Sequence, residues 1–247
     1  MHSRTSAAIV VAVALSALTG CASTPATSPA STSAMPATLD QAISATTASP
    51  GVAFTSSVEL VGRNPESTDP KTVCTGTTSW TPATGQWSCA WTLAYATHMA
   101  GDGTPEQALA QSTTNIINDS KYIWKQYPAD GPSWQQDEVE TLQPGCPATS
   151  PAYCAGPAAL LAYLDDIPFT VTTVDGGLHG VHTTNRDGVV TNSTVVITTD
   201  AQGRISHLLL TESWTSSERT DTAVTDLTIS NYGEQPAPTP PSDVHTS

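Results

Sequence analysis

Alternation of apolar and polar residues predicts a protein built mainly from β-strands. In residues 86–95 the large apolar side chains Trp87, Trp91, Leu93 and Tyr95 all stand at odd-numbered positions. Side chains two residues apart lie on the same face of a strand, so this spacing is typical of a half-buried strand. Comparable patterns predict further strands at residues 52–61, 121–127, 189–199, 204–214 and 218–232. Alternation alone indicates the strand at 121–127, and the other segments also contain β-branched residues that favour strands.

Two turn signals join these strands into hairpins. Asp200 and Gly203 begin and end a four-residue loop between two predicted strands, and both residue types favour tight turns. Residues 72–96 hold a second hairpin around the loop 81–85, which contains a proline and a glycine. Strands connected in this way predict an antiparallel sheet.

Helical patterns are fewer and short. A helix is expected at residues 39–46, directly before the first strand. Thr104, Pro105 and Gln107 form a capping-box pattern, which predicts the start of a second helix. That helix is expected to be brief, because residues 113–118 already have the pattern of a strand.

The strongest helical pattern occupies residues 158–166, after a Gly-Pro pair that suits a helix start. Leu160, Leu161 and Leu164 form an apolar stripe along it. A helix with one apolar side must bury that side against another element. The sequence therefore predicts an α+β fold, with a few helices packed on one face of an antiparallel sheet.

Residues 1–20 have the pattern of a bacterial lipoprotein signal peptide. Arg4 provides the positive charge, and residues 7–18 form an uncharged, mostly apolar stretch that is shorter than the roughly 20 residues a membrane-spanning helix needs. Residues 18–21 (Leu-Thr-Gly-Cys) then match a lipobox. The thiolate of Cys21 is the nucleophile that would accept a diacylglycerol. The alternative is an ordinary secretory signal with a chance cysteine at this position.

Composition divides the remaining chain into a tether, one domain and a tail. Residues 21–38 consist almost entirely of Ala, Ser, Thr and Pro after the cysteine, and residues 235–247 are polar and rich in proline. Neither segment holds enough apolar surface to offset the entropy lost on ordering, so both are expected to be disordered. The single folded domain is expected at residues 39–234.

The charge of the chain limits its partners. It has 22 acidic against 8 basic residues and a formal net charge of −14. Nucleic acids are excluded as partners, because their phosphates bind clustered Lys and Arg. Electrostatic docking on anionic lipid is excluded for the same reason. Attachment to the extracytoplasmic face of the cell membrane would therefore depend on the lipid on Cys21.

Four cysteines follow the lipobox: Cys74, Cys89, Cys146 and Cys154. An even number outside the cytoplasm predicts two disulfides, and three pairings are possible. Pairing of sequence neighbours is the simplest, because the hairpin at residues 72–96 would bring Cys74 and Cys89 opposite each other. The spacings lack the tight Cys-x-x-Cys of zinc sites, which disfavours a metal.

Motifs for catalysis and cofactor binding do not occur in the sequence. It contains no Gly-x-Ser-x-Gly nucleophile motif, phosphate-binding glycine loop or dinucleotide fingerprint. His179 and His182 would point to opposite faces of a strand, so surface histidines are expected there and not a metal site. We therefore expect no enzyme, cofactor or metal. Four tryptophans are candidates either for a pocket wall or for ordinary core packing: Trp80, Trp87, Trp91 and Trp134.

The order of these elements resembles the mycobacterial LprG and LppX group of lipoproteins and their actinobacterial relatives. The matching stretches are residues 120–134 (SKYIWKQYPADGPSW), 156–164 (GPAALLAYL), 198–204 (TTDAQGR) and 228–240 (TISNYGEQPAPTP). The resemblance implies a strongly curved antiparallel half-barrel with helices on its concave face, similar to the periplasmic lipoprotein carriers. It also implies that acyl chains of lipids or glycolipids are held between sheet and helices, and are moved across the cell envelope.

A cavity of that kind would be lined by apolar side chains from the sheet and from the helix at residues 158–166. The candidates are Trp91, Leu93, Trp124, Leu160, Leu161, Leu164, Leu208 and Leu210. Two other functions compete with acyl-chain binding. One is an envelope interaction module with a filled core, which would bind a protein or a cell-wall polymer. The other is an envelope enzyme, for which the sequence offers no specific motif.

Overall fold

The computed structural model describes residues 38–61, 71–80, 83–92, 94–96, 104–138, 156–217 and 219–246. All of them belong to one compact unit, residues 33–247. Several predicted features lie outside the described residues: the signal peptide, Cys21, the tether, Leu93, Cys146 and Cys154. Within the described residues, no helix is long and apolar enough to cross a membrane.

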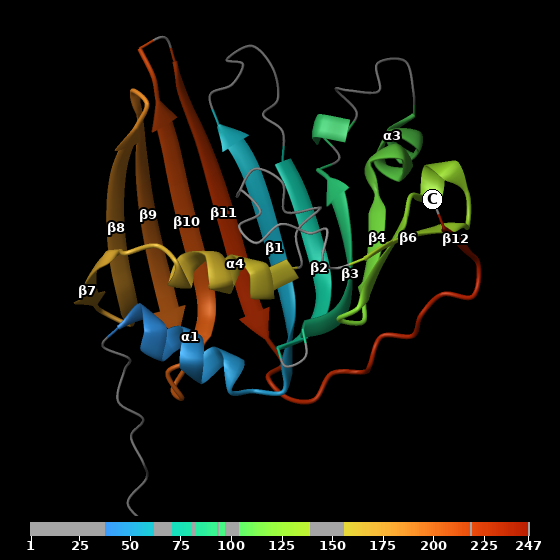
Figure 1. The fold of residues 1–247 in the computed structure, drawn as a ribbon, viewed down its shortest axis with the longest axis horizontal. Helices are drawn as coiled ribbons and strands as arrows, with labels where there is room; N and C mark the ends of the chain where they lie inside the picture. The colour runs from blue at the N-terminus through green and yellow to red at the C-terminus, as the bar shows by residue number, and fades with distance from the viewer. Residues whose placement is uncertain are drawn as a thin grey trace, which may run out of the picture. The chain divides into compact units, whose positions relative to one another are not determined.

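The described residues form one sheet of twelve strands, shown in Figure 1. The strands are β1 (Gly51–Val61), β2 (Lys71–Trp80), β3 (Ala83–Trp91), β4 (Thr114–Asn118), β5 (Tyr122–Gln126), β6 (Trp134–Glu138), β7 (Thr170–Val174), β8 (Gly177–Arg186), β9 (Val189–Thr199), β10 (Ile205–Thr215), β11 (Thr220–Ser230) and β12 (Val244–Thr246). The helices are α1 (Leu39–Thr47), α3 (Pro105–Ser112), α4 (Gly156–Asp165) and a short 3-10 helix, η1 (Pro128–Asp130).

The sheet consists of two meanders that meet at its centre. Strands β1 to β6 follow one another outward in one direction, and β11 to β7 follow one another in the other. Antiparallel pairing of β1 with β11, from Ala53 opposite Ser230 to Val61 opposite Thr222, joins the two halves. The predicted antiparallel sheet with helices is confirmed. The half-barrel around a ligand remains a prediction.

Side-chain hydrogen bonds and a glycine stabilise the predicted loop between β9 and β10. Between β9 and β10, Asp200 Oδ1 accepts hydrogen bonds from the backbone N–H groups of Gln202 (2.9 Å) and Arg204 (3.0 Å). Gly203 closes this loop with φ 78°, a left-handed conformation that glycine adopts without strain. The predicted β9–β10 hairpin is confirmed, with a bulge between Ile205 and His207.

Caps define two helix starts. In α1, Thr38 Oγ1 accepts a hydrogen bond from the Gln41 N–H at 3.2 Å. Before α3, the Thr104 N–H donates to Gln107 Oε1 (3.0 Å), and the Gln107 N–H donates back to Thr104 Oγ1 (3.3 Å). This reciprocal pair confirms the predicted capping box.

The predicted strand at residues 86–95 is too long. Strand β3 ends at Trp91, and Ala94–Ala96 are helical, with the Ala96 N–H donating to the Thr92 carbonyl at 2.9 Å. In the sequence, the alternation of apolar residues continues past Trp91 to Tyr95, but strand β3 ends at Trp91. The backbone of Thr92 makes its last sheet bond to the Lys71 carbonyl, at 2.8 Å.

The tail also differs from the prediction of disorder. Val244–Thr246 form β12, which pairs in parallel with β6, Val244 lying opposite Trp134. The Trp134 N–H donates to the Asp243 carbonyl at 3.0 Å. A three-residue strand has too little pattern to be recognised beside a proline-rich segment, and its partner strand is more than 100 residues away in the sequence.

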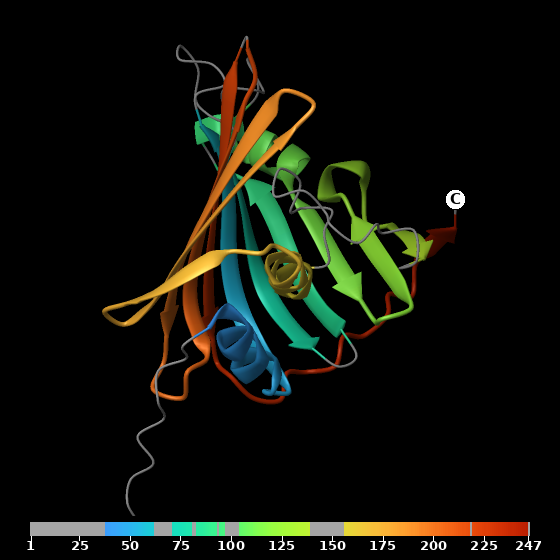
Figure 2. The ribbon, with the colours of Figure 1, turned by 60° about the vertical axis from the view of Figure 1, so that its left-hand side comes forward.

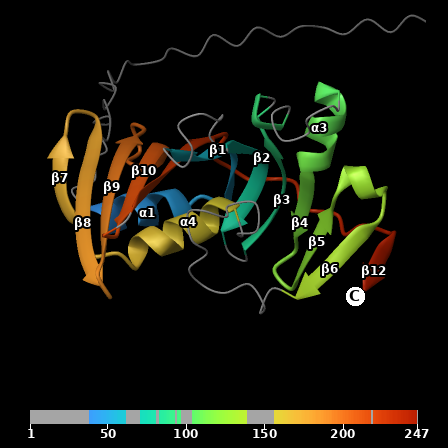
Figure 3. The same ribbon diagram turned by 90° about the horizontal axis from the view of Figure 1, so that it is seen from above.

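Helices α1 and α4 lie on the same face of the sheet, as Figures 1 and 2 show. Seen from above, the sheet is bent, with α1 and α4 on the side toward which its two edges turn (Figure 3). Leucines of both helices join the same buried apolar cluster as the sheet residues: Leu39 of α1, Leu161 and Leu164 of α4, and Phe54, Ile197, Leu208, Leu210 and Leu227 of the strands.

Candidate functional site

The face of the sheet that carries α1 and α4 is called the helix-covered face. Its position is fixed by Gly156, the first residue of α4, since a Cβ there would lie 3.8 Å from the rings of both Phe54 and Trp87. The strand register places other side chains on the same face. Leu227 lies opposite Leu208 on one side and Ser56 on the other, and side chains of directly paired residues share a face.

Five predicted lining residues come together on this face. Leu161, Leu164, Leu208 and Leu210 are almost completely buried in one cluster, and Leu160 packs against it. Three of these leucines belong to α4 and two to β10. The two elements are far apart in the sequence, and both were predicted. Burial of a leucine side chain stabilises a fold by about 1.5–3 kcal/mol, so this cluster holds α4 against the sheet.

Trp124 was expected beside these leucines but lies on the opposite face. It lies opposite Ile117, and Ile117 lies opposite Gln86, so the three side chains share one face. Gln86, which lies opposite Thr77, directly precedes the helix-facing Trp87 in β3. A shift of one residue reverses the face of a strand side chain. The ring is nevertheless buried, and its Nε1–H donates to Gln136 Oε1 at 3.3 Å.

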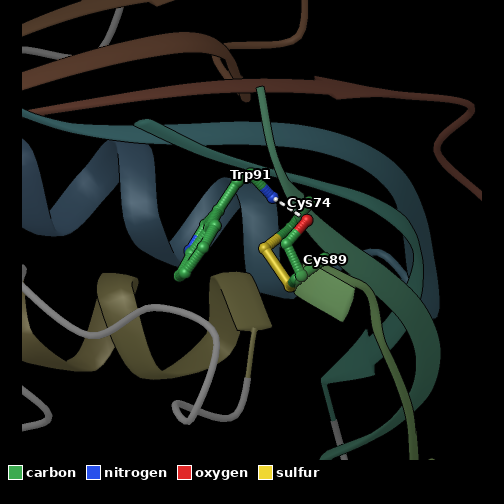
Figure 4. Close-up of a disulfide and its surroundings, with 4 residues drawn as sticks. Cys74, Cys89 and Trp91 are labelled. Carbon is green, nitrogen blue, oxygen red and sulfur yellow. Dashed lines mark hydrogen bonds between the residues drawn. A yellow bond between two sulfur atoms is a disulfide. The ribbon is translucent and has the colours of Figure 1, made fainter. Parts of the chain in front are cut away.

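The disulfide between Cys74 and Cys89 is present, as predicted from the hairpin. The two residues lie directly opposite each other in β2 and β3, with Cα atoms 4.0 Å apart, and both are buried. Trp91 lies on the same face beside the disulfide (Figure 4). Its backbone N–H donates to Ser112 Oγ at 3.3 Å, and its ring meets the ring of Tyr95 edge-on at 5.0 Å.

Helix α1 is attached to β10 by a completed set of polar contacts. The buried Thr46 hydroxyl accepts the N–H of Ile205 (2.8 Å) and donates to the Ala42 carbonyl (2.8 Å). The Tyr232 hydroxyl donates to the Ile205 carbonyl, so both backbone groups of Ile205 are paired. Burial, the largest cause, raises the pKa of Tyr232 to about 12.

The guanidinium of Arg204 covers the ring of Tyr232, 4.0 Å from its centre. The same guanidinium pairs with Asp200 Oδ2 at 2.6 Å. Partial burial alone would raise the pKa of Asp200, but the hydrogen bonds and charge of Arg204 outweigh it and lower that pKa below its ordinary value. The loop next to α1 is therefore held by charge as well as by backbone bonds.

Helix α4 is attached to β10 through a buried carboxyl group. The Tyr163 hydroxyl donates to Glu212 Oε1 at 2.5 Å, and the Ser193 hydroxyl donates to the same oxygen at 3.3 Å. Glu212 is only 1% exposed. Burial, followed by the hydrogen bond and charge of Glu212, raises the pKa of Tyr163 far above its ordinary value.

The second carboxyl oxygen, Glu212 Oε2, has no hydrogen-bond partner among the described residues. Three more buried polar atoms on the helix-covered face are in the same condition: Thr225 Oγ1, Trp80 Nε1 and Trp87 Nε1. Buried polar atoms in folded proteins are nearly always paired, because leaving one unpaired costs about 1–3 kcal/mol. This face therefore combines an apolar cluster with unused hydrogen-bonding capacity, which suits the binding of an amphipathic molecule.

Glu212 did not figure among the predicted site residues, although the sequence carries a signal for it. It follows Leu208 and Leu210 at alternate positions, so it continues the apolar face of its strand. An acidic residue at such a position must be buried with partners or beside a ligand.

The two histidines lie on opposite faces of β8, as their spacing predicts. His182 meets the ring of Phe169 edge-on at 6.2 Å, and two residues, Gly180 and the exposed Val181, separate it from His179 on the strand. Among the described residues, no three His, Cys, Asp or Glu side chains gather closely enough to hold a metal ion.

Comparison with known proteins finds no family model that matches this chain and no curated protein of similar sequence.

Proposed function

We propose that this chain is a lipid-anchored envelope protein that binds an acyl chain of a lipid or glycolipid between α4 and the sheet. The observation that carries the proposal is that five predicted lining leucines gather on the face that also holds the buried Glu212, whose Oε2 has no hydrogen-bond partner among the described residues. An acyl chain would contact the leucines, and a hydroxyl or amide group near its head would donate to Glu212. The bent sheet with helices on one face is the architecture that the LprG and LppX resemblance implies.

The anchor is part of the same proposal and has its own test. Replacing Cys21→Ala removes the only thiol of the lipobox, so the protein should move from the membrane fraction to the soluble fraction of its host. Intact mass of the unchanged protein should show a diacylglycerol on a chain that begins at Cys21. A mature protein cleaved elsewhere, with no added mass, would refute the anchor without affecting the ligand site.

Ligand binding is tested by native mass spectrometry of the full Cys21→Ala chain purified gently from its own host. The expected result is an excess mass that disappears on denaturation and is identified as a lipid. Leu160→Trp adds bulk beside the leucine cluster and should reduce the lipid-bound fraction. Leu109→Trp is the matched control, because Leu109 is an exposed residue of α3. A clean ligand-free mass for the parent protein would contradict the proposal.

A filled-core interaction module is the second candidate. The observation in its favour is that Leu164, Leu208 and Leu210 are already fully buried without any ligand. In that case α4 and β10 simply complete the interior, and partners bind elsewhere. The mass experiment separates the two, because the module predicts no lipid in any variant.

A further inference from the structure

A concave site lies on the face of the sheet opposite to α1 and α4. It is a groove of about 330 Å³ lined by Gln86, Trp87, Ser88, Asn115, Ile116, Ile117 and Trp134, here called the outer groove. Its volume is at the lower end of the range for small-molecule sites, about 300–1,000 Å³. The groove therefore suits a small ligand. It shares Trp87 with the helix-covered face, but it contains none of the leucines of the proposed acyl-chain site and not Glu212.

Two cross-strand rows form the floor of the outer groove. In one row Ser88 lies opposite Asn115, which lies opposite Gln126. In the next row Gln86 lies opposite Ile117. Trp134 is the first residue of β6. Because Gln135 pairs with Lys125, the register puts Trp134 beside Gln126, at the end of the first row. Its ring thus forms a wall at the end of a row of polar side chains.

The polar side chains of the floor are oriented by the protein and still have free hydrogen-bonding groups. Asn115 Nδ2 donates to Gln126 Oε1 (2.9 Å), and Gln126 Nε2 donates to the Pro132 carbonyl (2.8 Å). These bonds use Asn115 Nδ2 and not Asn115 Oδ1. Among the described residues, no hydrogen bond occupies that oxygen, the Gln86 amide or the Ser88 hydroxyl.

The lining residues carry no charge, and the whole chain has a net charge of −14. An anionic ligand is disfavoured on both counts. A peptide added as an extra strand is also disfavoured, because β3 and β4 are paired on both sides and offer no free edge. What remains is a neutral molecule that has one apolar face for an indole ring and several hydroxyl groups for amides.

We propose that the outer groove binds a neutral saccharide unit. The C–H face of a sugar ring would lie against the Trp134 indole, whose amphipathic ring suits a partly wet site. Neighbouring sugar hydroxyls would pair with the Gln86 amide, Asn115 Oδ1 and the Ser88 hydroxyl. Acyl-chain binding on the helix-covered face is not required for this site, so either proposal can fail alone.

The test is a titration of the full-length protein, kept in a zwitterionic detergent without a sugar headgroup, with four neutral trisaccharides. The probes are maltotriose, cellotriose, mannotriose and tri-N-acetylchitotriose, and trigalacturonate is the anionic control. At least one neutral probe should produce a saturable shift of the Trp134 indole N–H signal in NMR. Trp134→Ala and Gln86→Ala should weaken that binding at least tenfold, measured by calorimetry.

Trp214→Ala is the matched control, because Trp214 lies in β10, outside the groove. It should bind the same probe as tightly as the parent. Ser88→Leu fills the floor while keeping the tryptophan, and should abolish binding even if Trp134→Ala folds poorly. The proposal is overturned if all four neutral probes fail to bind, if trigalacturonate binds as tightly, or if the groove variants bind like the parent.

Discussion

Helices α1 and α4 both make polar contacts to strand β10, but these contacts differ. At α1, the Thr46 hydroxyl both accepts from the Ile205 N–H and donates to a backbone carbonyl, so its hydrogen-bonding capacity is used within the protein. At α4, the hydroxyls of Tyr163 and Ser193 both donate to one oxygen of Glu212, and the other oxygen has no partner among the described residues.

This difference separates a structural contact from a candidate binding contact. The α1 attachment is complete, so adding a ligand there would gain nothing. The α4 attachment leaves a buried acceptor unpaired, at a cost of about 1–3 kcal/mol that a ligand donor would offset. Ligand-dependent effects are therefore expected at α4 and not at α1.

The largest expected effects come from the apolar contacts, which the two helices have in common. Leu39→Ala in α1 and Leu164→Ala in α4 should each lower the free energy of unfolding by about 2–5 kcal/mol, since both leucines are buried and truncation leaves a cavity. Urea unfolding measures both. A cost of less than about 1 kcal/mol for Leu164→Ala would show that α4 is not packed against the sheet.

The α1 attachment is tested by Thr46→Val, which keeps the side-chain shape but leaves the buried Ile205 N–H unpaired. A loss of about 1–3 kcal/mol is expected in urea unfolding. Thr47→Val is the matched control, because Thr47 Oγ1 bonds only to carbonyls of its own helix, and its cost should be clearly smaller. Equal costs for the two variants would mean that Thr46 does not hold α1 to β10.

The α4 attachment should be weaker in the ligand-free protein. Tyr163→Phe removes one of two donors to Glu212 and should cost about 0.5–1.5 kcal/mol, the usual net value of a hydrogen bond. Glu212→Gln should cost less still, because it replaces a carboxyl oxygen that has no partner in the described part of the chain. The same variants should reduce lipid occupancy, whereas Thr46→Val should not. Unchanged occupancy in both α4 variants would remove Glu212 from the proposed site.

The smallest effect concerns pH at the α1 end. Asp200→Asn keeps an acceptor for the loop N–H groups but removes the ion pair with Arg204. Because the folded-state pKa of Asp200 is lowered, the ion pair stabilises the fold above the unfolded pKa, about 3.9. That contribution is lost as pH falls through the lower folded pKa. The variant should cost less than about 1 kcal/mol at pH 7 and nothing once the parent is protonated; a cost independent of pH would refute the assignment.

Local chemistry made much of the fold predictable from the sequence. The Thr104 capping box, the loop from Asp200 to Gly203 and the pairing of Cys74 with Cys89 each depend on residues close together in the chain. Their physical basis is short-range hydrogen bonding and a hairpin register, and the structure has all three.

Non-local pairing explains what could not be predicted. The face on which Trp124 lies depends on the register of β5 against β4, which no residue within β5 reveals. The buried role of Glu212 depends on Tyr163, 49 residues earlier in the chain. The outer groove likewise combines three strands, with Trp134 supplied from β6.

The most direct test of the acyl-chain site is isotope-filtered NMR of the full Cys21→Ala chain, stripped of ligand and mixed with monopalmitoylglycerol whose acyl chain is ¹³C-labelled, a neutral probe with hydroxyl donors beside the acyl chain. Contacts are expected between the acyl-chain methylenes and the methyl groups of Leu161, Leu164 and Leu210, and none to Leu39 of α1. Contacts confined to exposed valines such as Val181 and Val196, or no contacts at all, would contradict the proposed site.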